Sequence, residues 1–276
     1  MQEEIHGNDK ENGINDAGNN NPLPQFVLPD KQMRFIIALN RYNDLFEQLN
    51  YFAININELK LNEPNKIDKA FLLTGAKRLG VSFYERASVP DIARDLLGKI
   101  LVTNFDERLT AARIVETEAY NGIVDKASHA YNNRRTRRTE VMYGEAGTAY
   151  VYLCYGIHQL FNVVTNARDI PHAVLIRGAE PVAGFDIMLE RTGKTKVDET
   201  LTRGPGNVSK ALGIVTRHTG MSLLGNELFI AEDGYQYKKA SYASSGRIGV
   251  AYAAEDALLP YRFFIKGNPY VSGKPG

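Results

Sequence analysis

The sequence has a single cysteine, no tryptophan and no long apolar run, and these absences exclude several classes of protein. One cysteine, Cys154, cannot form an internal disulfide framework or a metal site built from several cysteines, so a reducing compartment is expected. The chain opens with acidic and amide residues rather than a basic and then apolar segment, and no apolar stretch approaches about 18 residues. We therefore expect a cytoplasmic protein without a signal peptide, a membrane-spanning helix or a metal centre.

The net charge of +1 is distributed unevenly over the 276 residues. Residues 1–30 carry six acidic side chains and one lysine, a net charge of −5, so residues 31–276 carry +6. This mildly basic remainder permits binding to phosphates but does not establish it. With 43% hydrophobic residues, the chain is long enough to bury a sizeable core.

Composition and apolar spacing divide the chain into three segments. Residues 1–30 are rich in asparagine, glycine and acids and predict a disordered tail. In residues 31–80, apolar side chains recur at helical spacing over 31–49 and 67–72 and predict a helical extension. Residues 81–276 show no repeat and no linker, so they predict a single domain that would carry any catalytic site.

Strand-forming residues cluster in the middle of that domain, and helical patterns lie mostly outside them. A short helix is predicted over residues 89–97, with Ser88 as its N-cap and Pro90 in its first turn. The predicted strands are 99–104, 112–120, 149–155, 160–165, 173–177, 228–231 and 261–265, and further helices are predicted at 182–191 and 207–212. This order favours an α+β fold with helices around an antiparallel or mixed sheet.

Two carboxylates occur on the predicted strand 112–120. Because side chains alternate along a strand, Ile114, Glu116, Glu118 and Tyr120 are expected on one face, with the intervening residues on the other. Such a row is often only the solvated face of a sheet. A paired general acid and base is the functional alternative, and the residues that follow favour a functional site.

A basic loop and a tyrosine-rich strand follow these carboxylates. The loop contains Asp125, Ser128 and His129, and then four arginines within five residues: Arg134, Arg135, Arg137 and Arg138. A charge run is usually solvated surface, but beside aromatic residues it favours nucleic acid, since cations follow the phosphates and rings stack on bases. Strand alternation places Tyr150 and Tyr152 on one face, so Tyr155 can serve the same site only from a turn beside Gly156.

Ordered motifs across residues 83–272 resemble the alkyladenine DNA glycosylase family, also called 3-methyladenine DNA glycosylases. The matching pieces are Arg113-Ile-Val-Glu-Thr-Glu-Ala-Tyr120, Ala127-Ser-His129, Thr148-Ala-Tyr-Val-Tyr152, Tyr155-Gly156, Asn162-Val-Val, Leu175-Ile-Arg177, Glu180-Pro181, Gly204-Pro-Gly206, Arg247-Ile-Gly249, Arg262-Phe263 and Gly267-Asn-Pro-Tyr-Val-Ser272. Each piece is weak evidence by itself, whereas the ordered set is specific. The resemblance implies a single domain on a curved, mainly antiparallel sheet, and removal of alkylated or deaminated purines from duplex DNA without cofactor or metal.

The resemblance also implies a role for each matching residue. Glu118 would be the general base that activates a water for attack on the sugar C1′, and Arg177 would help to hold that water. Tyr120 and Tyr152 would stack on the flipped base, and His129 would contact its edge. The resemblance further implies that Asn162 opposes the amine of normal guanine and that Tyr155 is a wedge in the minor groove. From the basic pattern itself we expect contacts to the DNA backbone from Arg134, Arg135, Arg137 and Lys210.

Two departures and several alternatives remain open. Asn207 stands where the family commonly has a lysine, with Lys210 three residues on, and Tyr261 replaces a family tryptophan. His129, Asn162 and Arg177 have structural alternatives, namely a satisfied buried histidine, an amide bonded to the backbone and an ion pair with Glu180. The rival functions are a glycoside hydrolase that uses Glu116 and Glu118, and a nucleic-acid-binding module without catalysis. The expected partner is double-stranded DNA with a damaged purine, bound by a monomer that is nucleoid-associated if bacterial.

Overall fold

The computed structural model describes residues 66–273, and the tail and most of the helical extension expected from the sequence lie outside the described residues. Within this range the helices are α2 (Lys69–Thr74), α3 (Val81–Tyr84), α4 (Val89–Asp95), α5 (Phe185–Thr192) and α6 (Pro205–Leu212). The strands are β1 (Lys77–Arg78), β2 (Ile100–Phe105), β3 (Arg108–Tyr120), β4 (Thr148–Cys154), β5 (His158–Thr165), β6 (His172–Ala183), β7 (Leu228–Glu232), β8 (Tyr242–Ser245) and β9 (Arg262–Ile265). Short 3-10 segments η1 (Gly122–Val124) to η7 (Ala251–Leu258) lie in the connections.

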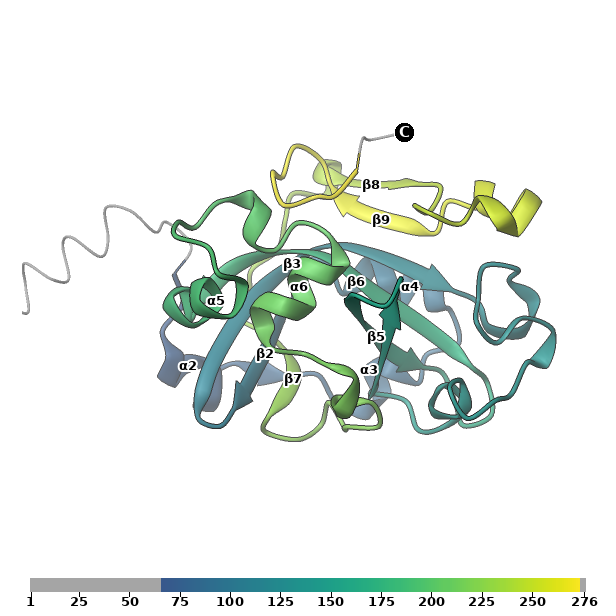
Figure 1. The fold of residues 1–276 in the computed structure, drawn as a ribbon, viewed down its shortest axis with the longest axis horizontal. Helices are drawn as coiled ribbons and strands as arrows, with labels where there is room; N and C mark the ends of the chain where they lie inside the picture. The colour runs from purple at the N-terminus through teal and green to yellow at the C-terminus, as the bar shows by residue number, and fades with distance from the viewer. Residues whose placement is uncertain (1–65, 274–276) are drawn as a thin grey trace, which may run out of the picture. The chain divides into compact units, whose positions relative to one another are not determined.

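The described strands form one curled antiparallel sheet (Figure 1). Its main order is β1-β7-β2-β3-β6-β5-β4, and β9 pairs with β3 and β8. Every pairing is antiparallel. The α+β fold on a curved, mainly antiparallel sheet is thus confirmed. Residues 77–78, within the segment expected to be a helical extension, add β1 to this sheet.

Strand β3 is the long central element, and it changes its neighbour along its length. Its first half, from Arg108 to Arg113, pairs with β2, and its second half pairs with β9 from Glu116 to Glu118. Between these halves the register against β6 shifts on both sides of Glu116. Such bulges redirect side chains, and here both Ile114 and Val115 lie in the main hydrophobic core. The expectation that Ile114 shares a face with Glu116, Glu118 and Tyr120 is therefore wrong.

Several predicted elements are confirmed with different ends. Helix α4 begins at Val89 as expected, because the Ser88 hydroxyl accepts the Asp91 N–H at 3.3 Å. The predicted helix 182–191 starts too early, since β6 continues to Ala183 and α5 begins at Phe185. Gly184 separates the two elements at φ 74°, where an added Cβ would collide with the Leu109 carbonyl. Strand β8 was not predicted; its sequence, Tyr-Ala-Ser-Ser, has little strand-forming character.

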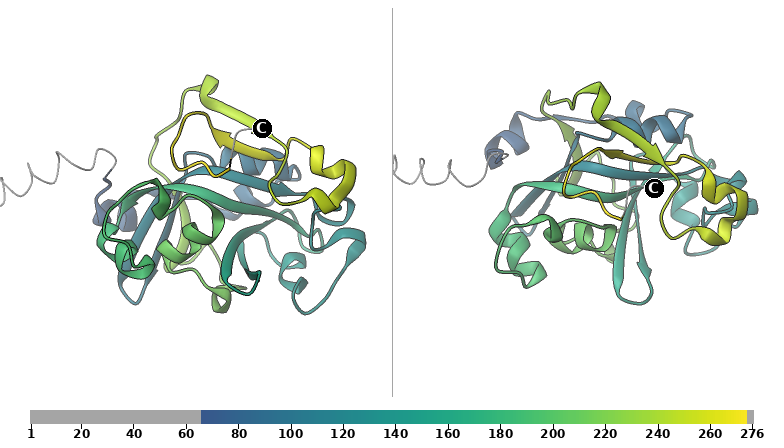
Figure 2. Two further views of the ribbon diagram at one scale, coloured as in Figure 1. Left: turned by 45° about the horizontal axis from the view of Figure 1, so that its top comes forward. Right: turned by 90° about the horizontal axis from the view of Figure 1, so that it is seen from above.

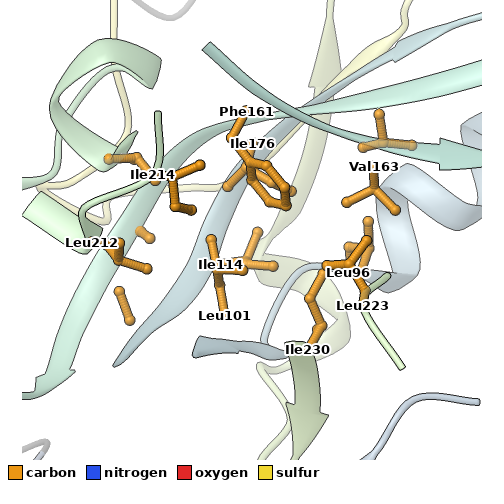
Figure 3. Packing of buried hydrophobic residues seen from close by; sticks show 14 of the residues in the cluster. Leu96, Leu101, Ile114, Phe161, Val163, Ile176, Leu212, Ile214, Leu223 and Ile230 are labelled. Carbon is orange, nitrogen blue, oxygen red and sulfur yellow. The ribbon is translucent and has the colours of Figure 1, made fainter. Parts of the chain in front are cut away.

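The main core lies inside the curl of the sheet (Figure 3). Leu101 of β2, Ile114 of β3 and Ile176 of β6 meet Leu96 beside α4 and Leu212 of α6. All five side chains are fully buried. At about 25 cal/mol per Å² of apolar surface, each contributes on the order of 2 kcal/mol to folding. This core fixes β3 and β6, which carry the carboxylates and Arg177.

Strands β4 and β5 form a hairpin that projects from the rest of the sheet (Figure 2, right). Pairing runs from Thr148↔Val164 to Cys154↔His158, which leaves Tyr155, Gly156 and Ile157 as the turn. No helix in residues 66–273 is long and apolar enough to cross a membrane.

Candidate active site

Glu118 is completely buried on β3, and three neighbours hold its carboxylate. The backbone N–H of Ile248 donates to Oε1 at 2.8 Å, and the Tyr120 hydroxyl donates to Oε2 at 2.8 Å. Nη1 of Arg177 lies 3.3 Å from the same Oε2. Burial and the nearby Glu118 charge hold the pKa of Tyr120 well above its usual value, so this phenol stays protonated and donates. The three neighbours separate Glu118 from an open cavity.

Glu116 is also completely buried, but its partners belong to the scaffold. Its Oε1 accepts from Nε of Arg177 at 3.0 Å and from Nε of Arg262 at 2.7 Å. The backbone N–H of Ser272 donates to Oε2 at 2.6 Å. Two carboxylates and two guanidinium groups thus form a cluster with no net charge, which lowers the cost of burying it.

This cluster decides two alternatives that the sequence left open. Arg177 pairs with Glu116 and Glu118, so the expected alternative of a simple pair with Glu180 is not the arrangement observed. Burial opposes the charged form of Arg177, but the charges of Glu118 and Glu116 raise its pKa above the usual value. The two carboxylates share one cation side by side and do not flank an open space, as a glycosidase pair must. The glycoside hydrolase alternative therefore has no geometric support.

The cavity above Glu118 has a volume of about 570 Å³, and aromatic, aliphatic and charged residues all contribute to its lining. Tyr120, His129, Tyr152 and Arg177 all line it, as the sequence predicted. The His129 and Tyr152 ring centroids are 4.6 Å apart at an interplanar angle of 73°. A cavity of this size, with aromatic walls and an ionic floor, suits a flat heteroaromatic ligand such as a purine.

His129 is held in the neutral form. Burial, followed by the positive charges of Arg138 and Arg134, lowers the pKa of His129 to about 4. Its Nδ1 lies 2.8 Å from the Tyr150 hydroxyl, whose pKa is raised above its usual value by burial. When the Tyr150 hydroxyl donates to Nδ1, the proton of the neutral ring is on Nε2, and His129 is a hydrogen-bond donor at the cavity.

Asn162 lies deeper than the tyrosines, in a small recess that continues from the cavity. The recess is also lined by Tyr120, His129 and Tyr152. The Asn162 amide donates to the backbone oxygens of Tyr150 at 3.2 Å and Leu160 at 3.3 Å. Asn162 is therefore both bonded to the backbone, as the structural alternative proposed, and placed beside the aromatic residues.

Tyr155 is in the turn of the β4–β5 hairpin, beside Gly156, as the sequence required. Its φ is 50° and its side chain is 89% exposed, yet it lines the rim of the cavity. An exposed aromatic residue in a left-handed turn is unfavourable for folding alone. This position is suited to contact with a partner.

The predicted backbone-binding residues fall into different environments. Arg135 is paired with Glu140 at 2.6 Å and Asp169 at 2.9 Å, whereas Arg134 and Arg137 have no ion pair within residues 66–273. Lys210 lies outside the main cavity, where its Nζ donates to the Thr192 carbonyl at 3.2 Å. Asn207, which replaces the family lysine, lines the main cavity together with Pro205 and Gly206 at the start of α6.

Sequence reasoning did not identify several residues that shape the site. Arg138 lies 4.9 Å from the Tyr152 ring centroid, and Tyr252 covers the cavity, with its hydroxyl donating to the Ala127 carbonyl at 3.2 Å. Arg247 pairs with the buried Asp125 and lies 4.9 Å from the Tyr120 ring centroid. The signal for Arg138 was its place in the arginine run, but Arg247 is more than 120 residues from its partner in sequence.

Within residues 66–273, no group of three or more His, Cys, Asp or Glu side chains could hold a metal ion.

Comparison with known proteins gives one consistent family. The sequence profile of methylpurine-DNA glycosylases matches residues 82–269. A protein of Desulfitobacterium hafniense named "Putative 3-methyladenine DNA glycosylase" is 44% identical over 205 residues, which are 72% of this chain and 100% of the relative. Proteins with the same name from Chlamydia felis and Bacillus cereus are each 44% identical, over 67% and 70% of this chain and 94% and 98% of the relatives.

Proposed function

The chain belongs to the methylpurine-DNA glycosylase family, and we propose that it excises alkylated or deaminated purines from duplex DNA with water activated by Glu118. As a member of this family it is an N-glycosylase of base excision repair. The observation that carries the proposal is the position of Glu118, which is buried beneath a cavity that is large enough to admit a purine nucleotide and has Tyr120 and Tyr152 in its lining.

Chemistry at a purine C1′ requires the nucleotide to leave the duplex. Unstacking costs a few kcal/mol, and stacking of the flipped base on Tyr120 and Tyr152 offsets it at about 1–3 kcal/mol per ring. Tyr155, exposed at the hairpin tip, would insert through the minor groove and fill the space that the flipped nucleotide leaves in the duplex. Nε2–H of His129 would donate to an acceptor on the base edge, and Asn162 would oppose the exocyclic amine of normal guanine.

In the bond-breaking step, the water oxygen attacks C1′, the bond from C1′ to purine N9 breaks, and Glu118 takes the water proton. A cationic alkylated purine leaves as a neutral base, because the electron pair of the broken bond cancels its charge. A neutral deaminated purine leaves as an anion and takes up a proton from solvent water. Arg177 favours the ionised state of Glu118 that this step requires. Tyr120 and Arg177 both lie at Oε2, whereas within residues 66–273 Oε1 accepts only from the Ile248 N–H, so Oε1 keeps a lone pair for the water proton.

The decisive variant is Glu118→Gln, which keeps the shape of the side chain and its contact with the Ile248 N–H. We expect release of 3-methyladenine or hypoxanthine from a single-lesion duplex to fall at least about a hundredfold, with lesion binding retained. Glu190→Gln, at an exposed carboxylate paired with Arg108, is the control that should retain full activity.

Activity in Glu118→Gln comparable with that of the unchanged protein would remove Glu118 from the mechanism. If the unchanged protein binds lesion DNA but releases neither base, the alternative of a non-catalytic nucleic-acid-binding module is favoured.

A further inference from the structure

The segment that follows β9 reaches back into the ionic cluster beneath the cavity. Ser272 is only 7% exposed, and both its backbone and its side chain contact Glu116. The N–H donates to Oε2 at 2.6 Å, and the hydroxyl donates to Oε1 at 3.0 Å. Residues 267–272 are therefore attached to β3 two positions before Glu118.

The Ser272 hydroxyl also contacts Arg177 directly. It accepts from Nη2 of Arg177 at 3.1 Å, while Nε of the same guanidinium donates to Glu116 at 3.0 Å. Only Nη1 of Arg177 faces Glu118, at 3.3 Å from Oε2. Glu116 and Ser272 thus bind Nε and Nη2, the two guanidinium nitrogens of Arg177 that do not face Glu118.

The backbone of this segment is fitted closely against the strand that carries Arg177. A Cβ added to Gly178 would lie 2.5 Å from the Tyr270 carbonyl oxygen and 3.2 Å from Cβ of Glu116. Real Cβ atoms do not approach so closely, so glycine is required next to Arg177 for the segment to lie here. Arg262 adds a further contact, because its Nη2 donates to the Ser272 carbonyl.

We propose that Glu116 and Ser272 are positioning residues that hold Arg177 in a one-nitrogen contact with Glu118. Arginine favours a bidentate pair with a carboxylate, in which two nitrogens bind both oxygens. A bidentate pair would occupy both oxygens of Glu118 and weaken it as a base. The fixed guanidinium instead stabilises the negative charge of Glu118 from the Oε2 side, while in the described part of the chain Oε1 accepts only from the Ile248 N–H. This inference rests on the proposed function of Glu118.

The test is Ser272→Ala, which removes the hydroxyl between Arg177 and Glu116 but keeps the backbone N–H. We expect the single-turnover rate constant of base release to fall about tenfold, as small misplacements of catalytic groups do, with the Kd for a lesion duplex unchanged. Ser272→Thr restores the hydroxyl and should restore the rate. Ser245→Ala is the matched control, since Ser245 accepts from Arg262 Nη1 at 3.1 Å but has no contact with Arg177 or Glu116 within residues 66–273.

A normal rate in Ser272→Ala would overturn the proposal, and so would a rate and an affinity that fall in the same proportion. Glu116→Gln provides a second measurement at the other contact. In folded Glu116→Gln protein, the rate constant of base release should fall while the affinity for lesion DNA is retained. An unchanged rate constant would overturn the role of Glu116. Activity in Glu118→Gln would refute the proposed function itself, whereas an inactive Glu118→Gln with a normal Ser272→Ala would refute only the positioning role.

Discussion

Replacement of His129 by glutamine should change how the stability of the protein depends on pH. The ordinary pKa of histidine is 6.5, and burial together with Arg138 and Arg134 lowers the pKa of His129 to about 4. Between these values the unfolded chain binds a proton at this position and the folded protein does not. Protonation therefore favours unfolding, so the stability associated with neutral His129 is complete above pH 6.5 and is lost as the pH falls toward 4.

The magnitude follows from the size of the shift. A change of one pKa unit corresponds to about 1.4 kcal/mol. Lowering the pKa of His129 from 6.5 to about 4 therefore reduces the free energy of unfolding, relative to its value at high pH, by about 2 kcal/mol at pH 5 and by about 3 kcal/mol below pH 4. His172 and His218 also have lowered pKa values, mainly from burial, but they are present in both proteins and cancel in the comparison.

The assay is urea unfolding of the unchanged protein and of His129→Gln at pH 8 and pH 5. The stability advantage of the unchanged protein should be about 2 kcal/mol smaller at pH 5 than at pH 8. An advantage that stays constant within about 0.5 kcal/mol would refute the reasoning, because His129 would then have similar proton affinity in both states. An advantage that grows at pH 5 would mean that folded His129 is cationic, and the donor role of neutral Nε2 would be lost with it.

Two further predictions concern the surface and the support of the cavity. The double variant Arg134→Ala, Arg137→Ala should reduce the slope of log affinity for DNA against log salt concentration by about 2. Arg135→Ala should change this slope less, because Arg135 is already paired with Glu140 and Asp169; equal slopes in all variants would show that the arginine cluster is only solvated surface. Arg247→Met should lower the free energy of unfolding by about 3–5 kcal/mol, because it leaves Asp125 buried without its ion pair. A loss of less than about 1 kcal/mol, measured by urea unfolding, would show that the protein does not need this pair.

The fold could be predicted to a useful degree because local patterns and tertiary packing agree in most elements. Alternating and apolar stretches identified the central strands, and Ser88 with Pro90 identified the start of α4. Predictions were wrong where neighbouring segments override local preference. Strand β6 continues through Pro181 to Ala183 because β3 pairs with it there, and the bulge beside Glu116 arises from pairing that alternation cannot reveal.

The sequence by itself determined the family, through ordered motifs, and it named five residues that the fold brings together at the cavity. Glu118, Tyr120, His129, Tyr152 and Arg177 meet as expected because each lies on a strand or loop whose local character is clear.

The family motif in the sequence singled out Glu118, but only the tertiary structure shows how the surroundings of Glu116 and Glu118 differ. The two carboxylates are identical in type and adjacent on one strand, but Glu116 faces Arg262 and Ser272, which lie about 150 residues away in the chain. Glu118 instead lies beneath the cavity, held by Tyr120 and the Ile248 N–H. Both are completely buried, so the difference between them is set by the neighbouring cavity and by partners distant in sequence, which only the folded chain brings together.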